Sequence, residues 1–413
     1  MMTMYRGPIF QQLLDWIKRN DRAMHTINLR NKSVNDDDVV SLADALLQNI
    51  SITHIDLSRN RIGDRGAIAL ATVLKHSPKL IELRLGMNEI GPIGARYLAD
   101  ALKDDVCRMK YLHLVGNDVG VEGAKAFAEA LGENSHLEKL GLEQNAIEND
   151  GACALGVALI RNNSLAKLEL GGNDIGPIGA DALAKGLRHN HRLGVLGLAG
   201  NDIQDEGATF IAEALRLNDT LFWLCLGRNQ IGAHGAKSIA DAIYDDRSPQ
   251  HIFDSNHHIE QIYGISDEEL KKCIRWNKGG VAETRRRKLS HFLSDHPDYC
   301  LKVDLDLKCI PTLLYKIGKE CSMDVMFRHL REMPDLFGDV SLSSNVGKAV
   351  VGSSPSLLDQ HKKVAGSRKW RRFGDVEKNK VDFDITLSLN TAEPRNHSKC
   401  KKYRRKQKAR WKE

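Results

Sequence analysis

Residues 165–187 read LAKLELGGNDIGPIGADALAKGL, and residues 193–215 repeat the pattern as LGVLGLAGNDIQDEGATFIAEAL. Each copy has a short stretch of alternating leucines, a polar turn containing Asn-Asp-Ile, and a longer stretch of small and apolar residues at helical spacing. The same unit continues in both directions along the chain. Its asparagine recurs at steps of 28, 29, 28, 28, 28 and 28 residues, at Asn60, Asn88, Asn117, Asn145, Asn173, Asn201 and Asn229.

Each period is consistent with one strand, one turn and one helix. In the unit that begins at His54, Ile55 and Leu57 alternate as in a strand, and Gly66 and Leu70 then follow helical spacing. A short strand and a three-turn helix cannot bury enough apolar surface alone, so the units must stack into one continuous core. A buried asparagine carboxamide can donate and accept hydrogen bonds between neighbouring turns. The pattern therefore predicts an α/β solenoid in which the asparagines form a structural ladder.

The unit LxxLxLxxNxIGxxGAxxLAxAL resembles the ribonuclease-inhibitor type of leucine-rich repeat, which is shared by ribonuclease inhibitors, NOD-like receptors and Ran GTPase-activating proteins. The resemblance covers about residues 26–259. It implies a right-handed horseshoe with parallel strands inside and helices outside. The segments Asp254–His257 (DSNH) and Met333–Phe337 (MPDLF) are similar to stand-alone proteins of this type from microbial eukaryotes. The family as a whole does not imply a single function.

The chain divides into four predicted parts: an N-terminal cap helix (1–24), the repeats (25–262), a helical C-terminal extension (263–338) and a disordered basic tail (339–413). The cap helix, residues 8–20, should bury one apolar face containing Ile9, Leu13, Trp16 and Ile17. A fading last repeat is expected to place Ile252, Asp254, His257 and Ile259 where the preceding repeat has Leu224, Leu226, Asn229 and Ile231. Helices are expected over 266–276, 281–293 and 323–333.

Composition favours a cytoplasmic or nuclear protein. The net charge of +6 arises at the C-terminal end, where residues 395–413 carry +9 and leave −3 for the rest (6 − 9 = −3). We see no secretory signal and no stretch of about 20 apolar residues, so no membrane association is expected. The eight cysteines form no CxxC pair, and no GxxxxGK[ST] loop occurs, so no metal, disulfide scaffold or nucleotide cofactor is expected. His257 and His258, without other clustered ligands, are interpreted as structural.

The informative residues are those that the repeat does not require, on the strand face opposite the helices, which we call the concave face. The last two repeats are expected to present a small, apolar floor with one large aromatic residue there. We predict that Trp223 anchors a protein partner, because tryptophan contributes a large contact area at low entropic cost. Cover by the chain's own helical extension is an open alternative for Trp223. The predicted contact residues are Arg84, Tyr111, His113, Glu169, Val195, Ala199 and Trp223.

A catalytic role is not expected. Asp56, Glu82, Glu143 and Glu169 are spread along the concave face, and no activated nucleophile accompanies them. The sequence therefore favours a non-enzymatic scaffold or regulator that binds a protein of unknown identity, and not a small molecule. A GTPase-activating protein for a Ran-like GTPase is the enzymatic alternative that the resemblance leaves open.

The basic tail supports a second alternative, because basic clusters with interspersed aromatic residues can bind nucleic acid. The same residues could serve as a nuclear import signal or remain solvated. The candidates for contact with nucleic acid or an import receptor are Lys369, Trp370, Arg371, Arg372, Lys401, Lys402, Arg404, Arg405 and Lys406.

Overall fold

The computed structural model describes residues 8–20, 22–247, 249–265, 268–278 and 281–295. All of them belong to one compact unit, Met1–Gly338. The second unit, Asp339–Glu413, lies outside the described residues, as do the third predicted helix of the extension (323–333) and the basic tail.

One parallel sheet of nine strands runs through the described residues, with the strands paired in sequence order. The buried middle residues stay in register, as in the pairing of Leu168 with Leu196 and of Leu196 with Leu224. This arrangement is the open α/β solenoid that the 28-residue period predicts. The strands are β1 (Thr26–Asn28), β2 (His54–Asp56), β3 (Glu82–Arg84), β4 (Tyr111–His113), β5 (Lys139–Gly141), β6 (Lys167–Glu169), β7 (Val195–Gly197), β8 (Trp223–Cys225) and β9 (Gln261–Tyr263).

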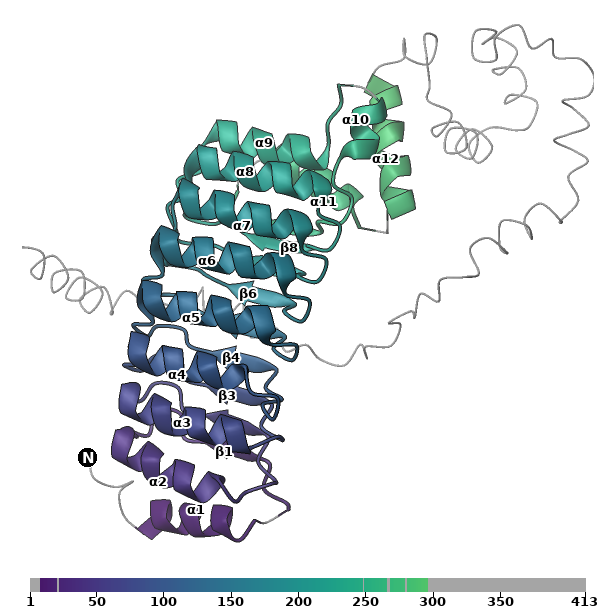
Figure 1. Ribbon diagram of the computed structural model, residues 1–413. Coiled ribbons are helices and arrows are strands. Elements are labelled where there is room, and N and C mark those ends of the chain that lie inside the picture. Colours follow the sequence, from purple (N-terminus) through teal and green to yellow (C-terminus); the bar gives the residue numbers. More distant parts are fainter. Residues whose placement is uncertain (1–7, 21, 248, 266–267, 279–280, 296–413) are drawn as a thin grey trace, which may run out of the picture. The chain divides into compact units, whose positions relative to one another are not determined.

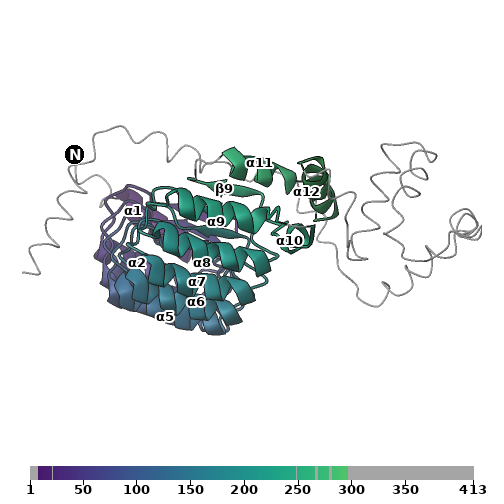
Figure 2. The same cartoon turned by 90° about the horizontal axis from the view of Figure 1, so that it is seen from above.

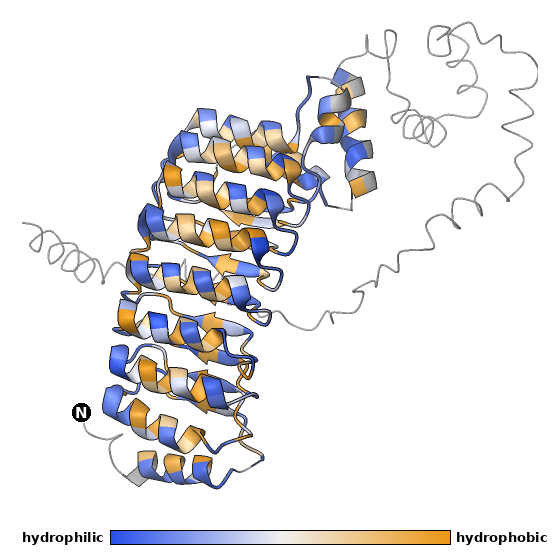
Figure 3. Ribbon diagram, viewed as in Figure 1, coloured by the Kyte–Doolittle hydropathy of each residue, from blue (hydrophilic) through white to orange (hydrophobic). Residues whose placement is uncertain are grey.

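A row of helices covers one face of the sheet (Figures 1 and 2). Each helix carries apolar and hydrophilic residues on different sides (Figure 3), as expected for helices that bury one face. Within the described residues, no helix has the length and apolar character needed to cross a bilayer. The helices are α1 (Pro8–Lys18), α2 (Asp36–Leu46), α3 (Asp64–His76), α4 (Pro92–Leu102), α5 (Gly120–Glu133), α6 (Glu148–Arg161), α7 (Pro177–His189), α8 (Gln204–Leu217) and α9 (Ala233–Ile243).

The N-terminal helix α1 packs on α2, but its buried face differs from the predicted one. Leu14 and Ile17 are buried, whereas Trp16 is 54% exposed. The apolar face is therefore centred on Leu14 and Ile17, and the large indole lies on the solvent side.

The predicted asparagine ladder is confirmed. The side-chain nitrogen of Asn60 donates to the carbonyl of Leu29 in the preceding repeat (2.9 Å), and its side-chain oxygen accepts from the backbone N–H of Val34 (3.1 Å). Asn201 makes the equivalent bonds to Leu170 (2.9 Å) and Ile175 (3.1 Å). Each carboxamide thus satisfies buried backbone groups of the neighbouring repeat.

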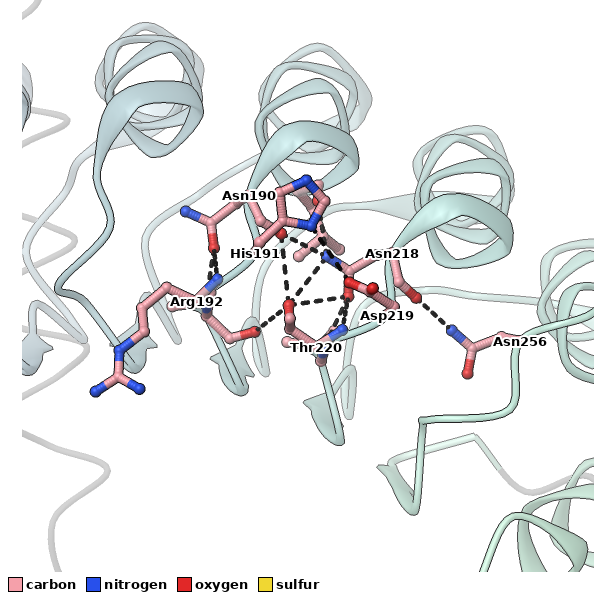
Figure 4. A network of polar contacts seen from close by, with 10 residues as sticks. Asn190, His191, Arg192, Asn218, Asp219, Thr220 and Asn256 are labelled. Atoms are coloured by element: carbon pink, nitrogen blue, oxygen red, sulfur yellow. Dashed lines mark hydrogen bonds and ion pairs between the residues drawn. The ribbon is translucent and has the colours of Figure 1, made fainter. Parts of the chain in front are cut away.

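A second asparagine ladder, which was not predicted from the sequence, follows the helices. The side-chain nitrogen of Asn218 donates to the carbonyl of Leu187 at the end of α7 (2.8 Å) and to the carbonyl of Asn190 (3.0 Å). Asn256 donates in turn to the Asn218 carbonyl (2.9 Å; Figure 4). These bonds satisfy carbonyls at helix C-termini that lack a partner within their own helix. The ladder comprises Asn134, Asn162, Asn190, Asn218 and Asn256.

Several helix N-termini are capped by the repeat before them. One carboxylate oxygen of Asp64, in α3, accepts from the backbone N–H groups of Gly91 and Gly94 at the start of α4, both at 2.8 Å. Asp36, Asn149 and Asp205 cap α3, α7 and α9 in the same way. These caps bind consecutive repeats together through helix ends.

The last repeat does not have the predicted register. Strand β9 aligns Ile262 with Leu224, and Asn256 takes the place of Asn218 in the second ladder. The step from Asn218 to Asn256 is 38 residues instead of 28, because the short helix α10 (Pro249–Asp254) is inserted before it. The predicted equivalence of Ile252 with Leu224 is therefore wrong.

Two of the helices predicted in the extension are present, α11 (Glu268–Trp276) and α12 (Val281–Asp295). Helix α11 packs on α9, and α12 packs on α10. Lys288 of α12 is fully buried. Its Nζ lies 2.7 Å from the Asn256 carbonyl and 3.2 Å from His257 Nδ1. It also contacts the Ile243 carbonyl at the end of α9. The predicted structural role of His257 thus has a specific partner.

Candidate protein-interaction surface

The strands of the sheet present two columns of side chains on the concave face. In each of β1 to β8 the middle residue is buried beneath the helices, while the residues before and after it point away from them. Neighbouring strands lie about 4.8 Å apart, so side chains of adjacent repeats are in contact. These contacts divide the concave face into two clusters.

The first cluster is centred on Glu82 of β3. Its Oε1 accepts from Arg84 Nε (2.7 Å) and lies 3.5 Å from His113 Nε2, while Oε2 lies 3.9 Å from His54 Nε2. Hydrogen bonding to His113 lowers the pKa of Glu82 to about 2, and the Arg84 guanidinium assists against the opposing effect of burial. The cluster borders an open depression of about 300 Å³ lined by Thr26, Asn28, His54, Ile55, Asp56, Glu82 and Arg84.

Tyr111 lies beside this cluster with partners of its own. Its ring is covered by Lys139 Nζ, 4.6 Å from the ring centroid, and its hydroxyl lies 3.5 Å from Glu138 Oε2. Tyr111 is therefore part of a local polar arrangement on β4 and β5.

The second cluster is centred on Trp223 of β8. The Tyr263 ring of β9 meets the indole edge to face, with centroids 5.8 Å apart, and Lys167 Nζ lies 5.3 Å from the centre of the indole. Lys167 also pairs with Glu169 Oε1 at 2.8 Å. Val195 is the residue of β7 that pairs with Trp223. Trp223 is half-buried, so Tyr263 and Lys167 cover it in part and leave part of it open.

The floor between these side chains is not the apolar surface that the sequence suggests. A Cβ at Gly197 would lie 1.6 Å from Glu169 Oε2, so the Glu169 carboxylate rests directly on the bare backbone of β7. Similarly, a Cβ at Gly141 would lie 3.1 Å from Glu143 Oε2. The small residues therefore do not make the floor apolar, because they leave room for two carboxylates to lie flat across the strands.

Two polar atoms in this cluster have no hydrogen-bond partner among the described residues, Glu143 Oε2 and Trp223 Nε1, and both are covered from solvent. Glu143 as a residue is half-buried. Burial and the nearby charge of Glu169 together raise the pKa of Glu143 to about 7, while Lys167 acts in the opposite direction. A buried carboxylate and a buried indole N–H are thus left with unmet hydrogen-bonding capacity.

The predicted contact residues fall into separate groups. Arg84 and His113 belong to the Glu82 cluster, while Glu169 and Val195 belong to the Trp223 cluster. Ala199, which follows β7, contributes a backbone carbonyl that accepts from Gly172 N–H at 2.8 Å.

Three members of the Trp223 cluster were not among the predicted contact residues: Glu143, Lys167 and Tyr263. Glu143 was expected on the concave face, but without a contact role. Tyr263 was missed because of the wrong register in the last repeat. Aligning Asn256 with Asn218 would have placed it in the column of Cys225.

The described part of the chain contains no group of three or more His, Cys, Asp or Glu side chains arranged to hold a metal ion. The cysteines described, Cys107, Cys153, Cys225 and Cys273, are free thiols. The basic residues predicted to contact nucleic acid or an import receptor lie outside the described residues.

The comparison with known families places leucine-rich repeats in this chain. The Leucine Rich repeat family model matches residues 48–71, 76–99, 108–128, 133–156, 161–184 and 189–212. No curated protein is significantly similar in sequence.

Two similar solved structures are the Actin-Binding Site 2 of leiomodin-1 and a Caenorhabditis elegans tropomodulin C-terminal domain. The leiomodin-1 structure is 28% identical, with a TM-score of 0.31, and the match covers 33% of this chain and 79% of that one. The tropomodulin domain is 20% identical, with a TM-score of 0.32, and the match covers 37% and 92%. These TM-scores are too low to carry a functional argument.

Proposed function

We propose that this leucine-rich repeat protein is a non-enzymatic interaction module that binds a protein partner on its concave face, with Trp223 as the main anchor. The observation that carries the proposal is the half-open indole of Trp223, held by Tyr263 and Lys167 on a regular sheet. Rigid, partly desolvated aromatic side chains are typical interaction hot spots. The repeat array supplies the preorganised surface that limits the entropic penalty of binding.

Site-specific cross-linking tests this proposal. A photoreactive amino acid is placed at Val195, beside Trp223, in the intact chain and in Trp223→Ala, and both are irradiated in native lysate. The matched control carries the same amino acid at Val157, which is 66% exposed on helix α6. We expect a discrete protein adduct from position 195 only, which is lost with Trp223→Ala while circular dichroism shows the variant to be folded. An adduct from position 157 alone would contradict binding on the concave face.

Further measurements distinguish the alternatives predicted from the sequence. A Ran-like GTPase in the adduct, together with faster GTP hydrolysis when the chain is added, would favour the GTPase-activating role. Nucleic-acid binding by the basic clusters would be favoured if the intact chain, but not a chain without the tail, retained material that nuclease removes.

A further inference from the structure

We infer that the Trp223 cluster recognises an extended peptide segment of the partner, in which one Lys or Arg side chain inserts beside Glu143 and Glu169. This inference rests on the proposed function and deepens it by assigning the chemistry of the anchor residue. It is carried by the geometry of the cluster, in which groups with opposite hydrogen-bonding needs are left unsatisfied.

One carboxylate oxygen at the acidic end of the cluster has no donor among the described residues. Glu143 and Glu169 lie on neighbouring repeats, and the basic group beside them, Lys167, is paired with Glu169 Oε1. Glu143 Oε2 remains without a donor, although it is covered. An ammonium or guanidinium group would supply both the charge and the donors that this oxygen lacks.

The aromatic end of the cluster needs an acceptor. Trp223 Nε1 is a donor only, and it is also covered and unpartnered among the described residues. A metal ion or a simple amine would satisfy the carboxylates but not this N–H. A peptide can satisfy both ends, because its basic side chain donates and its backbone carbonyls accept.

The spacing fits a short extended segment. Glu143 follows β5, and Trp223 is in β8, three strand spacings away, which corresponds to about 14 Å. An extended chain advances about 3.4 Å per residue, so about four residues separate the basic side chain from the carbonyl that meets Trp223 Nε1. Gly171, between these points, presents no side chain, and over Gly197 the segment meets the Glu169 carboxylate, which is one of the two carboxylates that the basic side chain would contact.

The cluster already shows how a cation is accommodated. Lys167 Nζ is held between the Glu169 carboxylate and the face of the Trp223 ring, at 2.8 Å and 5.3 Å. This pairing of a carboxylate with an aromatic face is the arrangement that stabilises alkylammonium and guanidinium groups. A second basic group beside Glu143 would extend the same arrangement by one repeat.

Binding of a cation should depend on pH. Glu143 faces Glu169 and Lys167 on β6, and on the other side His113 of β4, whose Nδ1 lies near the same Gly141 position. The pKa of Glu143 is about 7, so the carboxyl group is protonated in part of the molecules at neutral pH. A protonated carboxyl group carries no charge and does not attract a cation. Affinity should therefore rise between about pH 6 and pH 8, as Glu143 loses its proton.

The test uses the full chain and a defined probe, the peptide acetyl-Gly-Gly-Arg-Gly-Gly-Gly-Gly-amide, with citrulline in place of arginine as the uncharged control. Binding is followed by the indole 15N–1H signal of Trp223, identified by its loss in Trp223→Phe. We expect saturable binding of the arginine peptide at pH 8, with the citrulline peptide about tenfold weaker. Glu143→Gln and Glu169→Gln should each weaken binding about fivefold or more, and Glu82→Gln in the other cluster should leave it unchanged.

A stability measurement separates a binding role from a structural one. Glu143→Gln should unfold at the same temperature as the parent or a higher one at pH 8, because it removes a buried unpaired carboxylate. Loss of both stability and binding, equal binding of the citrulline peptide, or no saturable shift would overturn the inference. If the peptide fails while Trp223→Ala still abolishes the cross-link at position 195, the proposed function stands and the basic anchor is wrong.

Discussion

Two glutamates on the same sheet face have pKa values shifted in opposite directions, and the cause is their immediate neighbours. Glu82 is surrounded by Arg84, His54 and His113, so its charged form is stabilised and its pKa is about 2. Glu143 is covered without a donor, with the charge of Glu169 nearby, and its pKa is about 7. The first residue contributes to stability at neutral pH, whereas the second reduces it.

The Glu82 cluster predicts a pH-dependent stability difference. Because the folded pKa of about 2 lies below the ordinary 4.5, the contribution of Glu82 is fully present above pH 4.5 and is lost as pH falls toward 2. Glu82→Gln should therefore lower the free energy of unfolding by on the order of 1 to 3 kcal/mol at pH 7, and by progressively less below pH 4.5. Urea unfolding at several pH values measures this difference. The control Asp37→Asn removes an exposed pair with Arg65 and should change stability by less than about 0.5 kcal/mol. A constant difference for Glu82→Gln at every pH would contradict the assigned role.

The sequence predicted which strand positions lie on the concave face, but not which of their side chains contact one another. Trp223 could be placed because its flanking leucine belongs to a strict period. The contact between Glu169 and Gly197 could not, since it depends on a carboxylate of one repeat bending over a residue 28 positions later that has no Cβ. The pairing of Lys167 with Trp223 likewise crosses two repeats.

Helices α3 to α9 begin in two ways, and the residue of the preceding repeat decides which. Where that repeat supplies Asp or Asn, as Asp64 does for α4, the helix starts at an extended glycine such as Gly91 whose N–H is capped. Where it supplies Pro177, helix α8 starts instead at Gln204, which has a positive φ of 59° and donates its N–H to the Asn229 carbonyl. The backbone strain of a non-glycine residue at positive φ thus accompanies the missing cap.

Asp64→Ala should destabilise the array by about 1 kcal/mol, and up to about 2, because one carboxylate oxygen caps two N–H groups of α4. Amide hydrogen exchange should increase at the start of α4, which lies in the next repeat. The control Asp241→Ala removes an exposed pair with Lys237 and should have little effect. Faster exchange confined to α3 would show that the cap acts within its own helix instead.

Lys288 predicts how the C-terminal helices are held. Burial lowers its pKa to about 7, and an uncharged amine has two N–H donors and one lone pair, which match the carbonyls of Ile243 and Asn256 and the His257 ring nitrogen. Lys288→Met should destabilise the chain by about 1 to 3 kcal/mol, since the two carbonyls lose this donor.

The pH dependence gives a second readout for Lys288. Its folded pKa lies below the ordinary 10.5, so the parent should gain stability relative to Lys288→Met as pH rises from about 7 to 10. Lys75→Met, at an exposed position of α3, is the control and should show no such trend. A difference that shrinks with rising pH would show that Lys288 is charged in the folded chain.

The array as a whole was the most predictable property of this protein. The 28-residue period predicted one strand and one helix per repeat, which β2 to β8 and α3 to α9 show. The end of the array was not predictable in the same way, because the inserted helix α10 places Asn256 outside the 28-residue period. Repeat counting is reliable only while each unit repeats the length of the one before it.

The coupling between the repeats that end with α6 and those that begin with α7 should depend on Gly156, and we call these two groups the halves of the array. A Cβ there would lie 2.3 Å from the Ala182 carbonyl of α7, so Gly156→Ala must push α6 and α7 apart. We expect a loss of about 1 to 3 kcal/mol and a shallower denaturant transition as the halves uncouple. Gly132→Ala is the matched control, because open space surrounds that position in α5, and it should stabilise the chain by about 0.5 to 1 kcal/mol. Equal effects of the two substitutions would exclude this coupling.

The close contact of α6 with α7 also has a geometric consequence. A solenoid of this kind bends because helices need about 8 to 10 Å of axial spacing while strands need only about 4.8 Å. Where Gly156 and Gly186 let two helices approach backbone to backbone, that mismatch is reduced, and the local radius of curvature increases. The straighter segment lies at β6, the strand that connects α6 to α7 and carries Glu169. A peptide crossing β6 would therefore follow a nearly linear path, which suits an extended backbone better than an arc.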